Sequence, residues 1–372
     1  MLIGYISPTN PFEDRKAWSG TYFNTRKALE KAGHQVEWIP YKNGGIMDKI
    51  FRRGYRLFYG NGSYVHSSAA SWLHTKSIKE DLEKYDLLFI PGQVDIVAGL
   101  KNVTTPIIYY TDGTVPLMID YYWFNFSKRA IKEAVAIEKK AMCNAHYNWF
   151  ASQWAAQSAI DDYDIAPKNV DVFPFGPGID DKNINKLHSH FNRKLKLMFS
   201  GVDWKRKGGQ IAVNAAEELN NRGISTELIM CGINELPKSV SNKPFIKNMG
   251  FLNKNIPGDF DKYQKVWRQA DILILPTRAE CAGIVFSEAA EYGVPVITTD
   301  TGGVGTYVKN NFNGKRLPLS ANGNDYADEI ECWINNNDIY RLSSGASQIY
   351  TEEISWTAWK NHFNKTIGNM SL

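Results

Sequence analysis

The stretch from Ala270 to Gly293, ADILILPTRAECAGIVFSEAAEYG, reads as a strand, a loop and a helix. Residues 271–276 form a short apolar run that predicts a buried strand. A polar loop with Glu280 follows, and residues 284–292 predict a helix. Gly283 stands where the helix begins, and a residue without a Cβ allows the backbone to approach a ligand closely there. This order of elements is typical of α/β proteins with parallel sheets.

The same alternation of apolar runs and amphipathic stretches continues along the chain and predicts two successive sets of βαβ units. Gly33 follows the helix of residues 21–32, as a C-cap residue would. Residues 353–367 predict one amphipathic helix with Trp356, Trp359 and Phe363 on one face, which should pack against another element. The expected strands are residues 2–7, 35–39, 86–91, 106–111, 147–152, 171–174, 195–200, 226–231, 245–249, 271–276 and 294–299, and further helices are 209–222, 263–269 and 284–292.

The chain is long enough for two domains, since 372 residues exceed what one hydrophobic core usually serves. A polar stretch at residues 181–194, rich in Asn, Lys and His, separates the two sets of strands and predicts an interdomain linker. We therefore expect two Rossmann-like domains, residues 1–185 and 186–350, followed by a terminal helical segment, residues 351–372.

Composition describes an ordinary globular protein, with 43% hydrophobic residues, 22% charged residues and a net charge of +4. This charge argues against nucleic acid as a partner but is compatible with anionic substrates or acidic lipid. The four cysteines lack the spacing of a metal site or a disulfide framework and predict reduced thiols. Without a leader or a long apolar run, we expect a cytoplasmic protein, free or peripheral at the inner membrane face.

The predicted helix start near Gly283 is a candidate anion site. Backbone N–H groups in the first turn of a helix lack intrahelical partners, and the helix dipole adds a positive end, so Gly283, Ile284 and Val285 could receive a diphosphate. Glu280 and Glu288, with seven residues between them, flank this site and should bind hydroxyl groups on either side, because phosphate repels carboxylates. Alternatively, Glu288 is a solvated helix residue, the usual state of a glutamate.

The segment Pro276-Thr-Arg-Ala-Glu280, the glutamate at 288 and the following YGVPVITTDTGGV (292–304) resemble the donor-site signature of family 4 retaining glycosyltransferases, which are group 1 enzymes with the GT-B fold. The stretches 151–158 and 173–180 are also similar to this family. The resemblance implies two Rossmann-like domains facing a deep cleft and a terminal helix that crosses back to the first domain, with hinges near 181–194 and 345–355. It further implies that Glu280 contacts hydroxyls of the transferred sugar and Glu288 the nucleotide ribose, while the backbone of Ala282, Gly283, Ile284 and Val285 holds phosphate.

A second donor element is GVDWKRKG (201–208), after the strand of residues 195–200. Loops at the carboxyl ends of strands face ligands in such folds, so Lys207 is a candidate phosphate ligand. The alternative is a basic surface turn, which a Lys-Arg-Lys run often is. Relatives commonly carry an arginine where this chain has Val202, and Arg206 is the expected substitute for that charge. The chain also departs from many relatives at Gly305 and Thr306.

The first domain offers two weaker candidates. Gly20, in the loop WSGTY (18–22), corresponds to a family glycine near the donor phosphates, although Ser19 could equally be an N-cap residue. Asp112, in YTDGT (110–114), takes the place of a histidine that contacts the transferred sugar in many relatives. A plain turn before Gly113 explains it equally well.

The resemblance implies a retaining hexosyltransferase that works with a UDP- or GDP-sugar and a saccharide, lipid-linked or polyol acceptor, in the synthesis of cell-surface glycans or glycoconjugates. No Ser/His/Asp or Cys/His arrangement is visible, which favours same-face attack with Lys207, Glu280 and Asp112 as the catalytic candidates. No metal motif stands in a suitable loop, so we expect a metal-independent enzyme without a cofactor. Two alternatives stay open, a sugar-nucleotide epimerase of similar build and a catalytically silent sugar-nucleotide-binding subunit. An NAD enzyme is disfavoured because no GxGxxG opens either domain.

Overall fold

The computed structural model describes residues 1–179 and 194–368. The chain divides into two compact units, the first formed by Met1–Pro174 with the chain from Trp359 onward, the second by Phe175–Ala358. Apart from Lys194, the predicted linker at residues 181–194 lies outside the described residues, as does the expected boundary at residues 185 and 186.

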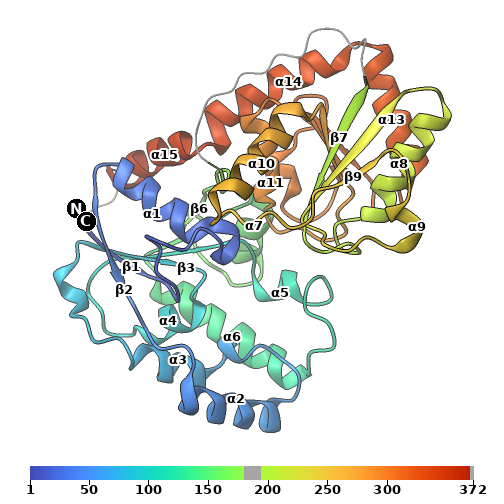
Figure 1. Ribbon diagram of the computed structural model, residues 1–372. Coiled ribbons are helices and arrows are strands. Elements are labelled where there is room, and N and C mark those ends of the chain that lie inside the picture. Colours follow the sequence, from blue (N-terminus) through green and yellow to red (C-terminus); the bar gives the residue numbers. More distant parts are fainter. Residues whose placement is uncertain (180–193, 369–372) are drawn as a thin grey trace. The chain divides into compact units, whose positions relative to one another are not determined.

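The first unit is built on a six-stranded sheet in the order β2-β1-β3-β4-β5-β6, with every neighbouring pair parallel. Its strands are β1 (Leu2–Ile6), β2 (Gln35–Ile39), β3 (Leu87–Pro91), β4 (Ile107–Thr111), β5 (Tyr147–Phe150) and β6 (Val170–Val172). Its helices are α1 (Thr21–Lys31), α2 (Gly45–Tyr59), α3 (Ser68–Thr75), α4 (Val94–Gly99), α5 (Val115–Met118), α6 (Lys128–Asn144) and α7 (Gln153–Asp161). Figure 1 shows α3, α4 and α6 together on one side of this sheet.

A row of aromatic rings crosses one face of this sheet. Tyr5, Phe89, Tyr110 and Trp149 come from β1, β3, β4 and β5, and successive ring centroids lie 5.6, 5.8 and 6.5 Å apart. The hydroxyl of Tyr5 bonds to α1, and the ring of Trp359 packs 6.1 Å from that of Phe89. This face is therefore covered by α1 and by the final helix, whereas Ile6, Leu88, Ile90 and Tyr109 belong to the aliphatic core with α4 and α6.

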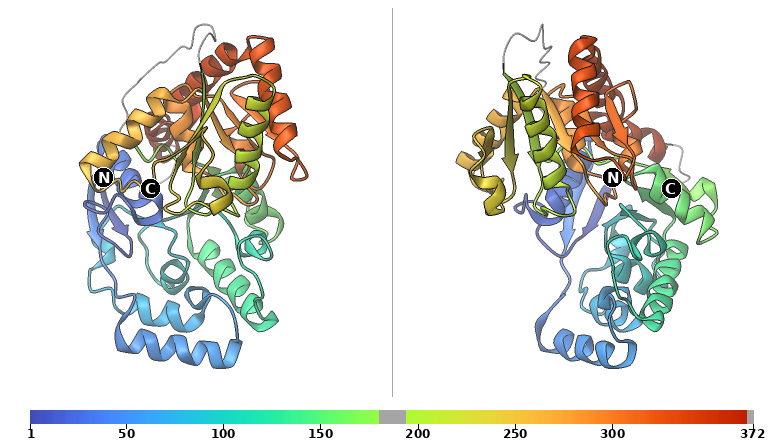
Figure 2. Two further views of the ribbon diagram at one scale, coloured as in Figure 1. Left: turned by 45° about the vertical axis from the view of Figure 1, so that its right-hand side comes forward. Right: turned by 90° about the vertical axis from the view of Figure 1, so that its right-hand side faces the viewer.

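The second unit holds another parallel six-stranded sheet, in the order β12-β11-β10-β7-β8-β9. Counted from its own first strand, this is the order of a Rossmann fold, 3-2-1-4-5-6. The strand order reverses between β7 and β10, because β8 and β9 are added to one side of β7 and the last three strands to its other side. Its strands are β7 (Leu195–Ser200), β8 (Thr226–Cys231), β9 (Ile246–Asn248), β10 (Ile272–Leu275), β11 (Val296–Thr299) and β12 (Gly314–Leu317). Figure 2 shows helices on both faces of it, and the helices of the unit are α8 (Gly209–Asn221), α9 (Lys238–Ser241), α10 (Pro257–Gln269), α11 (Ile284–Glu291), α12 (Val304–Tyr307), α13 (Gly323–Asn335) and α14 (Asp338–Ile349).

The two parallel sheets confirm the predicted α/β architecture, but individual elements differ from expectation, and helices such as α2, α13 and α14 are not among the expected ones. Strand β12 was not predicted, because its sequence GKRL contains a single apolar residue. Helix α10 begins at Pro257, six residues before the predicted start at Tyr263. Its first turns were not predicted, because they carry mostly polar or exposed residues and show no apolar periodicity. The predicted helix over residues 353–367 is interrupted: a π-helical turn over Tyr350–Ile354 ends at Ser355, and α15 (Trp356–Gly368) begins after it.

The three aromatic residues expected on one face of the final helix are all buried. Trp356 belongs to the second unit, where its Nε1 donates to the carbonyl of Pro177 at 2.8 Å. Trp359 and Phe363 belong to the first unit and pack against Trp149. Within the described residues, no helix is both long and apolar enough to cross a membrane.

Candidate functional site

The predicted donor residues of the second unit gather where the strand order of its sheet reverses, between β7 and β10. β7 and β10 are hydrogen-bonded neighbours, so the loops after their carboxyl ends, residues 201–208 and 276–283, lie side by side. Ligands in open α/β sheets bind outside the carboxyl ends of the strands at such a reversal. The fold therefore places Lys207 and Glu280 at the position where a nucleotide-binding site is expected.

Lys207 and Glu280 form a buried ion pair between Nζ and Oε2. The interpretation of Lys207 as part of a basic surface turn is therefore wrong, while its neighbour Lys205 is indeed exposed. Arg206 takes a different place: its Nη1 donates to the carbonyl of Ala279 at 3.0 Å and lies 4.0 Å from Glu280 Oε2. Because two cations converge on one carboxylate, the charge of Glu280 is compensated without solvent.

Glycine explains how closely the two loops approach each other. Gly208 has a φ of +71°, and a Cβ on it would lie 2.0 Å from the carbonyl oxygen of Pro276. The backbone of the first loop thus packs directly on the end of β10, which sets Lys207 beside Glu280. The carbonyl of Glu280 also accepts a hydrogen bond of 3.0 Å from the N–H of Gly303, so the loop after β11 supports the glutamate from the other side.

The loop ends at Gly283, the N-cap residue of α11, with a φ of +82°. A Cβ on Gly283 would lie 2.5 Å from the Phe286 ring. The ring therefore packs directly against the backbone at the start of the helix. Ala282 is buried, whereas Ile284 and Val285 are partly accessible at the helix start. The first backbone N–H groups of α11 therefore stand next to the Lys207–Glu280 pair as donors for an anion.

Glu288 is also buried, which excludes the interpretation as a solvated helix residue. Its Oε2 accepts a hydrogen bond of 2.6 Å from Tyr263 Oη, and its Oε1 lies 2.5 Å from Lys254 Nζ. Sequence reasoning missed Tyr263 and Lys254, because they lie on α10 and in the loop before it and match no motif. Burial, followed by the charge of Glu288, raises the pKa of Cys231 to about 12, so this thiol stays protonated at neutral pH.

Gly20 and Asp112 belong to the first unit. Gly20, with a φ of +91°, is the N-cap residue of α1, and Ser19 has a left-handed backbone, so Ser19 is not the cap. Asp112 follows β4 and is half-buried. Burial raises the pKa of Tyr22, and the charge of Asp112 adds to that shift, which places this carboxylate near the first turn of α1.

No group of three or more His, Cys, Asp and Glu side chains that could hold a metal ion occurs in residues 1–179 and 194–368. The structure thus brings Arg206, Lys207, Glu280 and the start of α11 together within the second unit, with Glu288 farther along the same helix. Gly20 and Asp112 stand in the other unit.

Comparison with known proteins agrees with this arrangement. Residues 180–346 match the family of glycosyl transferases group 1. A D-inositol 3-phosphate glycosyltransferase of Arthrobacter sp. (strain FB24) is 26% identical over 220 residues, which are 57% of this chain and 49% of that protein. The chain spans about half the length of the curated relatives it matches.

Solved structures resemble the chain over its whole length. A sucrose-phosphate synthase from Thermosynechococcus elongatus superposes with a TM-score of 0.67 at 14% identity, covering 99% of this chain and 98% of the other. Anabaena Alr3699/HepE in complex with UDP-glucose gives a TM-score of 0.63 at 15% identity over 100% of both chains. At such identities the likeness concerns the fold. Together the two findings show the GT-B fold for the chain and similarity to the group 1 glycosyltransferases over residues 180–346.

Proposed function

We propose that the protein is a retaining glycosyltransferase that moves a hexose from a UDP- or GDP-sugar to a hydroxyl acceptor. The observation that carries this proposal is the buried Lys207–Glu280 pair beside the start of α11, at the reversal point of the second sheet. A lysine, a helix N-terminus and a carboxylate in one place supply what a sugar diphosphate needs: cationic and N–H donors for phosphate and an acceptor for sugar hydroxyls.

In this proposal Lys207 and the first amides of α11 bind the diphosphate. Lys207 leaves its contact with Glu280 when phosphate oxygens compete for its ammonium group, and Glu280 is then free to accept hydrogen bonds from the transferred sugar. Arg206 holds the Glu280 loop through the Ala279 carbonyl and adds positive charge 4.0 Å from the carboxylate. Glu288 accepts from the nucleotide ribose, held in place by Tyr263 and Lys254.

The proposed chemistry needs no protein nucleophile. The bond between the anomeric carbon and the diphosphate oxygen breaks, a bond to the acceptor oxygen forms on the same face, and the departing phosphate takes the acceptor proton. Lys207 and the α11 dipole stabilise the negative charge that develops on the diphosphate, so we propose that no metal ion is required. Gly20 and Asp112 are proposed to contact the donor phosphates and the transferred sugar.

The donor class and the location follow from separate observations. Alr3699/HepE was solved with UDP-glucose, so UDP-sugars are the first donors to test. The four cysteines lack the spacing of a disulfide framework, which supports a reducing, cytoplasmic location, with peripheral membrane contact and without nucleic acid as a partner. We propose a saccharide, lipid-linked or polyol acceptor and a role in cell-surface glycan or glycoconjugate synthesis.

A thermal-shift panel of UDP- and GDP-sugars with and without EDTA tests the proposal. A donor that binds the native state should raise Tm by mass action, and EDTA should leave the shift unchanged. Glu288→Gln should reduce the shift, whereas the exposed Glu235→Gln is the matched control. If no nucleotide sugar stabilises the protein, the proposed function is wrong.

Measurements of the transfer rate distinguish the proposed role of Glu280 from that of Glu288, and the proposed transferase from an epimerase. Glu280→Gln should lower transfer by about 10²-fold while the donor still binds, because the sugar loses a charged hydrogen-bond acceptor at the reacting centre. Unchanged transfer in this variant would contradict the role of Glu280. Incubation with the donor alone should leave the sugar configuration unchanged, whereas an isomerised sugar would indicate an epimerase.

A further inference from the structure

Helix α2 of the first unit exposes its large apolar residues to solvent, whereas an amphipathic helix of a globular protein usually buries them. Of its 15 residues, the two buried ones are Asp48 and Tyr55. Its large apolar residues are exposed instead, and their exposed fractions are 78% for Ile46, 54% for Met47, 57% for Ile50, 80% for Leu57 and 76% for Phe58. Single exposed apolar residues are common, but five on one helix form a patch that indicates a binding surface.

The position of α2 in its unit makes this patch accessible. In Figure 1 and Figure 2, α3 lies between α2 and the rest of the first unit, so α2 is an outer layer added to the helices that cover the sheet. Its packing partner is α3, which itself packs on α4. The outward face of α2 is therefore not needed to cover the core of the unit.

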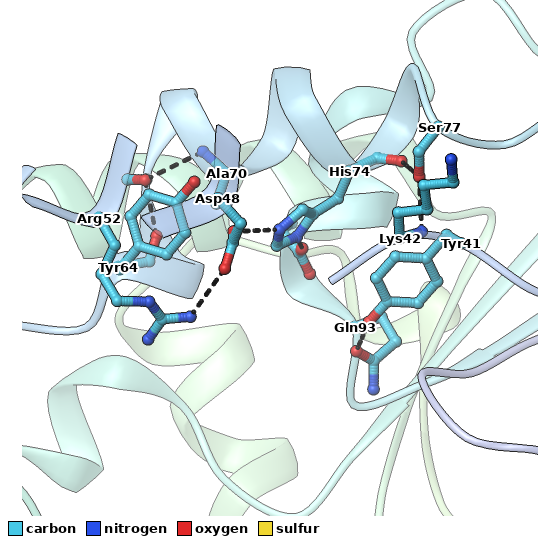
Figure 3. A network of polar contacts seen from close by, with 11 residues as sticks. Tyr41, Lys42, Asp48, Arg52, Tyr64, Ala70, His74, Ser77 and Gln93 are labelled. Carbon is cyan, nitrogen blue, oxygen red and sulfur yellow. Dashed lines mark hydrogen bonds and ion pairs between the residues drawn. The ribbon is translucent and has the colours of Figure 1, made fainter. Parts of the chain in front are cut away.

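A buried polar cluster fixes which face of α2 points inward (Figure 3). Asp48 Oδ1 lies 2.9 Å from His74 Nε2 on α3, and His74 Nδ1 lies 2.5 Å from Asp95 Oδ2 on α4. Arg52, one turn after Asp48, reaches its other carboxylate oxygen at 3.4 Å and lies over the Tyr64 ring. These contacts anchor α2 through charge and hydrogen bonds, so its apolar side chains remain directed outward.

The outward surface combines an apolar sector with a basic flank. At ~100° per residue, Ile46, Ile50 and Leu57 fall within about 40° of one another on the side opposite Asp48. Exposed Lys49, Arg53 and Arg56 occupy one edge of that sector, while the one acidic residue of the helix, Asp48, is buried.

The patch continues onto α3. The ring of exposed Trp72 lies 5.9 Å from that of Phe51, and Lys76 Nζ lies 4.7 Å above the Trp72 ring. Apolar side chains bordered by lysine and arginine, next to an aromatic residue, are what a helix needs to lie in the interface of a bilayer with anionic head groups.

We propose that α2, together with Trp72 and Lys76, is a docking surface for an anionic lipid bilayer. Ile46, Ile50 and Leu57 enter the boundary between head groups and acyl chains, and the basic flank contacts lipid phosphates. Charge complementarity favours this occupant over a second copy of the chain, since a two-fold contact would set the basic flanks close together. The proposal depends on the first unit alone and not on the proposed transfer activity.

Vesicle flotation of the full chain tests this proposal. The protein should float with vesicles that contain phosphatidylglycerol and much less with phosphatidylcholine alone, and added salt should weaken binding. Leu57→Ser with Phe58→Ser, and Arg53→Glu with Arg56→Glu, should each lower the bound fraction at least about ten-fold. Hydrogen exchange should show protection of α2 amides on the anionic vesicles.

Matched controls lie in the second unit. Ile256→Ser with Leu319→Ser removes two exposed apolar residues, and Lys238→Glu with Lys265→Glu reverses two exposed charges. Neither pair should change flotation, and all four double variants should keep the Tm of the wild type, because the residues are exposed. The proposal would be overturned if the protein did not float with anionic vesicles, or if the control pairs lost binding as much as the α2 pairs. It would also be overturned if the protein formed a dimer without lipid and the α2 variants dissociated that dimer.

Discussion

Helices α11 and α2 carry similar numbers of apolar side chains but use them in opposite ways. In α11, Phe286, Ala289 and Ala290 are buried, and the carboxylate of Glu288 is held inside by Tyr263 and Lys254. In α2, the buried positions are polar or aromatic, and Ile46, Leu57 and Phe58 are exposed. In the sites proposed above, α11 therefore binds its ligand through its backbone terminus and a positioned carboxylate, whereas α2 binds through its side-chain surface.

The two helices suit two kinds of ligand, because their side chains differ in burial. A small polar ligand needs few groups held rigidly, and the dense packing around α11 provides that rigidity. A large flat partner needs exposed area, and α2 provides it at the cost of apolar contact with its own unit.

The largest difference is expected between two phenylalanine truncations. Phe286→Ala removes a buried ring from under the first turn of α11 and should lower the free energy of unfolding by ~3–5 kcal/mol. Phe58→Ala removes an exposed ring from α2 and should change it by no more than about 0.5 kcal/mol. Urea unfolding followed by circular dichroism measures both.

A large loss of stability in Phe58→Ala would show that α2 packs through its apolar residues. It would contradict the difference between α2, with exposed apolar residues, and α11, with buried ones. A small loss in Phe286→Ala would show that α11 can close the cavity, which the proposed rigid helix start does not allow.

A second comparison concerns two glycines with left-handed backbones. Gly208→Ala should destabilise the second unit by ~2–4 kcal/mol, because the new Cβ would meet the Pro276 carbonyl oxygen in addition to the backbone strain. Gly223→Ala, with a φ of +82° and nothing within 4 Å, should cost only the strain, about 1 kcal/mol. Thermal unfolding of the two variants gives the difference, and equal losses would mean that the two loops need not touch.

Much of the fold could be predicted from sequence where side chains alone encode the element. The predicted strands at residues 195–200 and 226–231 match β7 and β8, because each consists largely of apolar residues bounded by polar ones. Helix α2 did not stand out, since a pattern search assumes that apolar residues face inward. Strand β12 is held by backbone pairing with β11 and shows almost no apolar pattern.

The candidate site could be predicted only in part. Lys207, Glu280 and Glu288 stand in contiguous motifs, and the structure brings Lys207 and Glu280 together as an ion pair. Lys254 reaches Glu288 across 34 positions of sequence, a contact that depends on how the loop after β9 folds back. The cluster of Asp48, His74 and Asp95 joins three helices, and no local pattern links residues so far apart.

A smaller effect is expected from removing one hydroxyl near α11. Tyr263→Phe deletes the 2.6 Å hydrogen bond to buried Glu288 and should lower the free energy of unfolding by ~1–3 kcal/mol, because part of the carboxylate loses its donor. Donor affinity should fall as well, since Glu288 loses a support of its proposed ribose-binding orientation. Tyr340→Phe is the control, as its side chain is exposed, and it should change neither quantity. Unaltered stability in Tyr263→Phe would mean that Lys254 alone satisfies Glu288.

The smallest effect tests the charge that anchors α2. Burial alone lowers the pKa of His74, but hydrogen bonds and charges from Asp95 and Asp48 outweigh it and raise the pKa above the ordinary value of 6.5. The folded state therefore binds this proton more tightly than the unfolded state does. The resulting stabilisation is complete below pH 6.5 and is lost as the pH rises through the folded-state pKa.

Asp48→Asn removes one of the two carboxylates at His74, so its Tm should fall less than that of the wild type as the pH rises above 6.5. Tyr41, Tyr64 and Arg52 also lie against this cluster, and they are the same in both proteins. Burial raises the pKa of Glu138 to about 7, so this group also titrates in the same pH range. Subtracting the two Tm profiles removes the contribution of such distant groups, because the variant leaves them unchanged. If the two profiles were parallel, packing rather than charge would hold α2 in place, and α2 would differ from α11 in exposure alone.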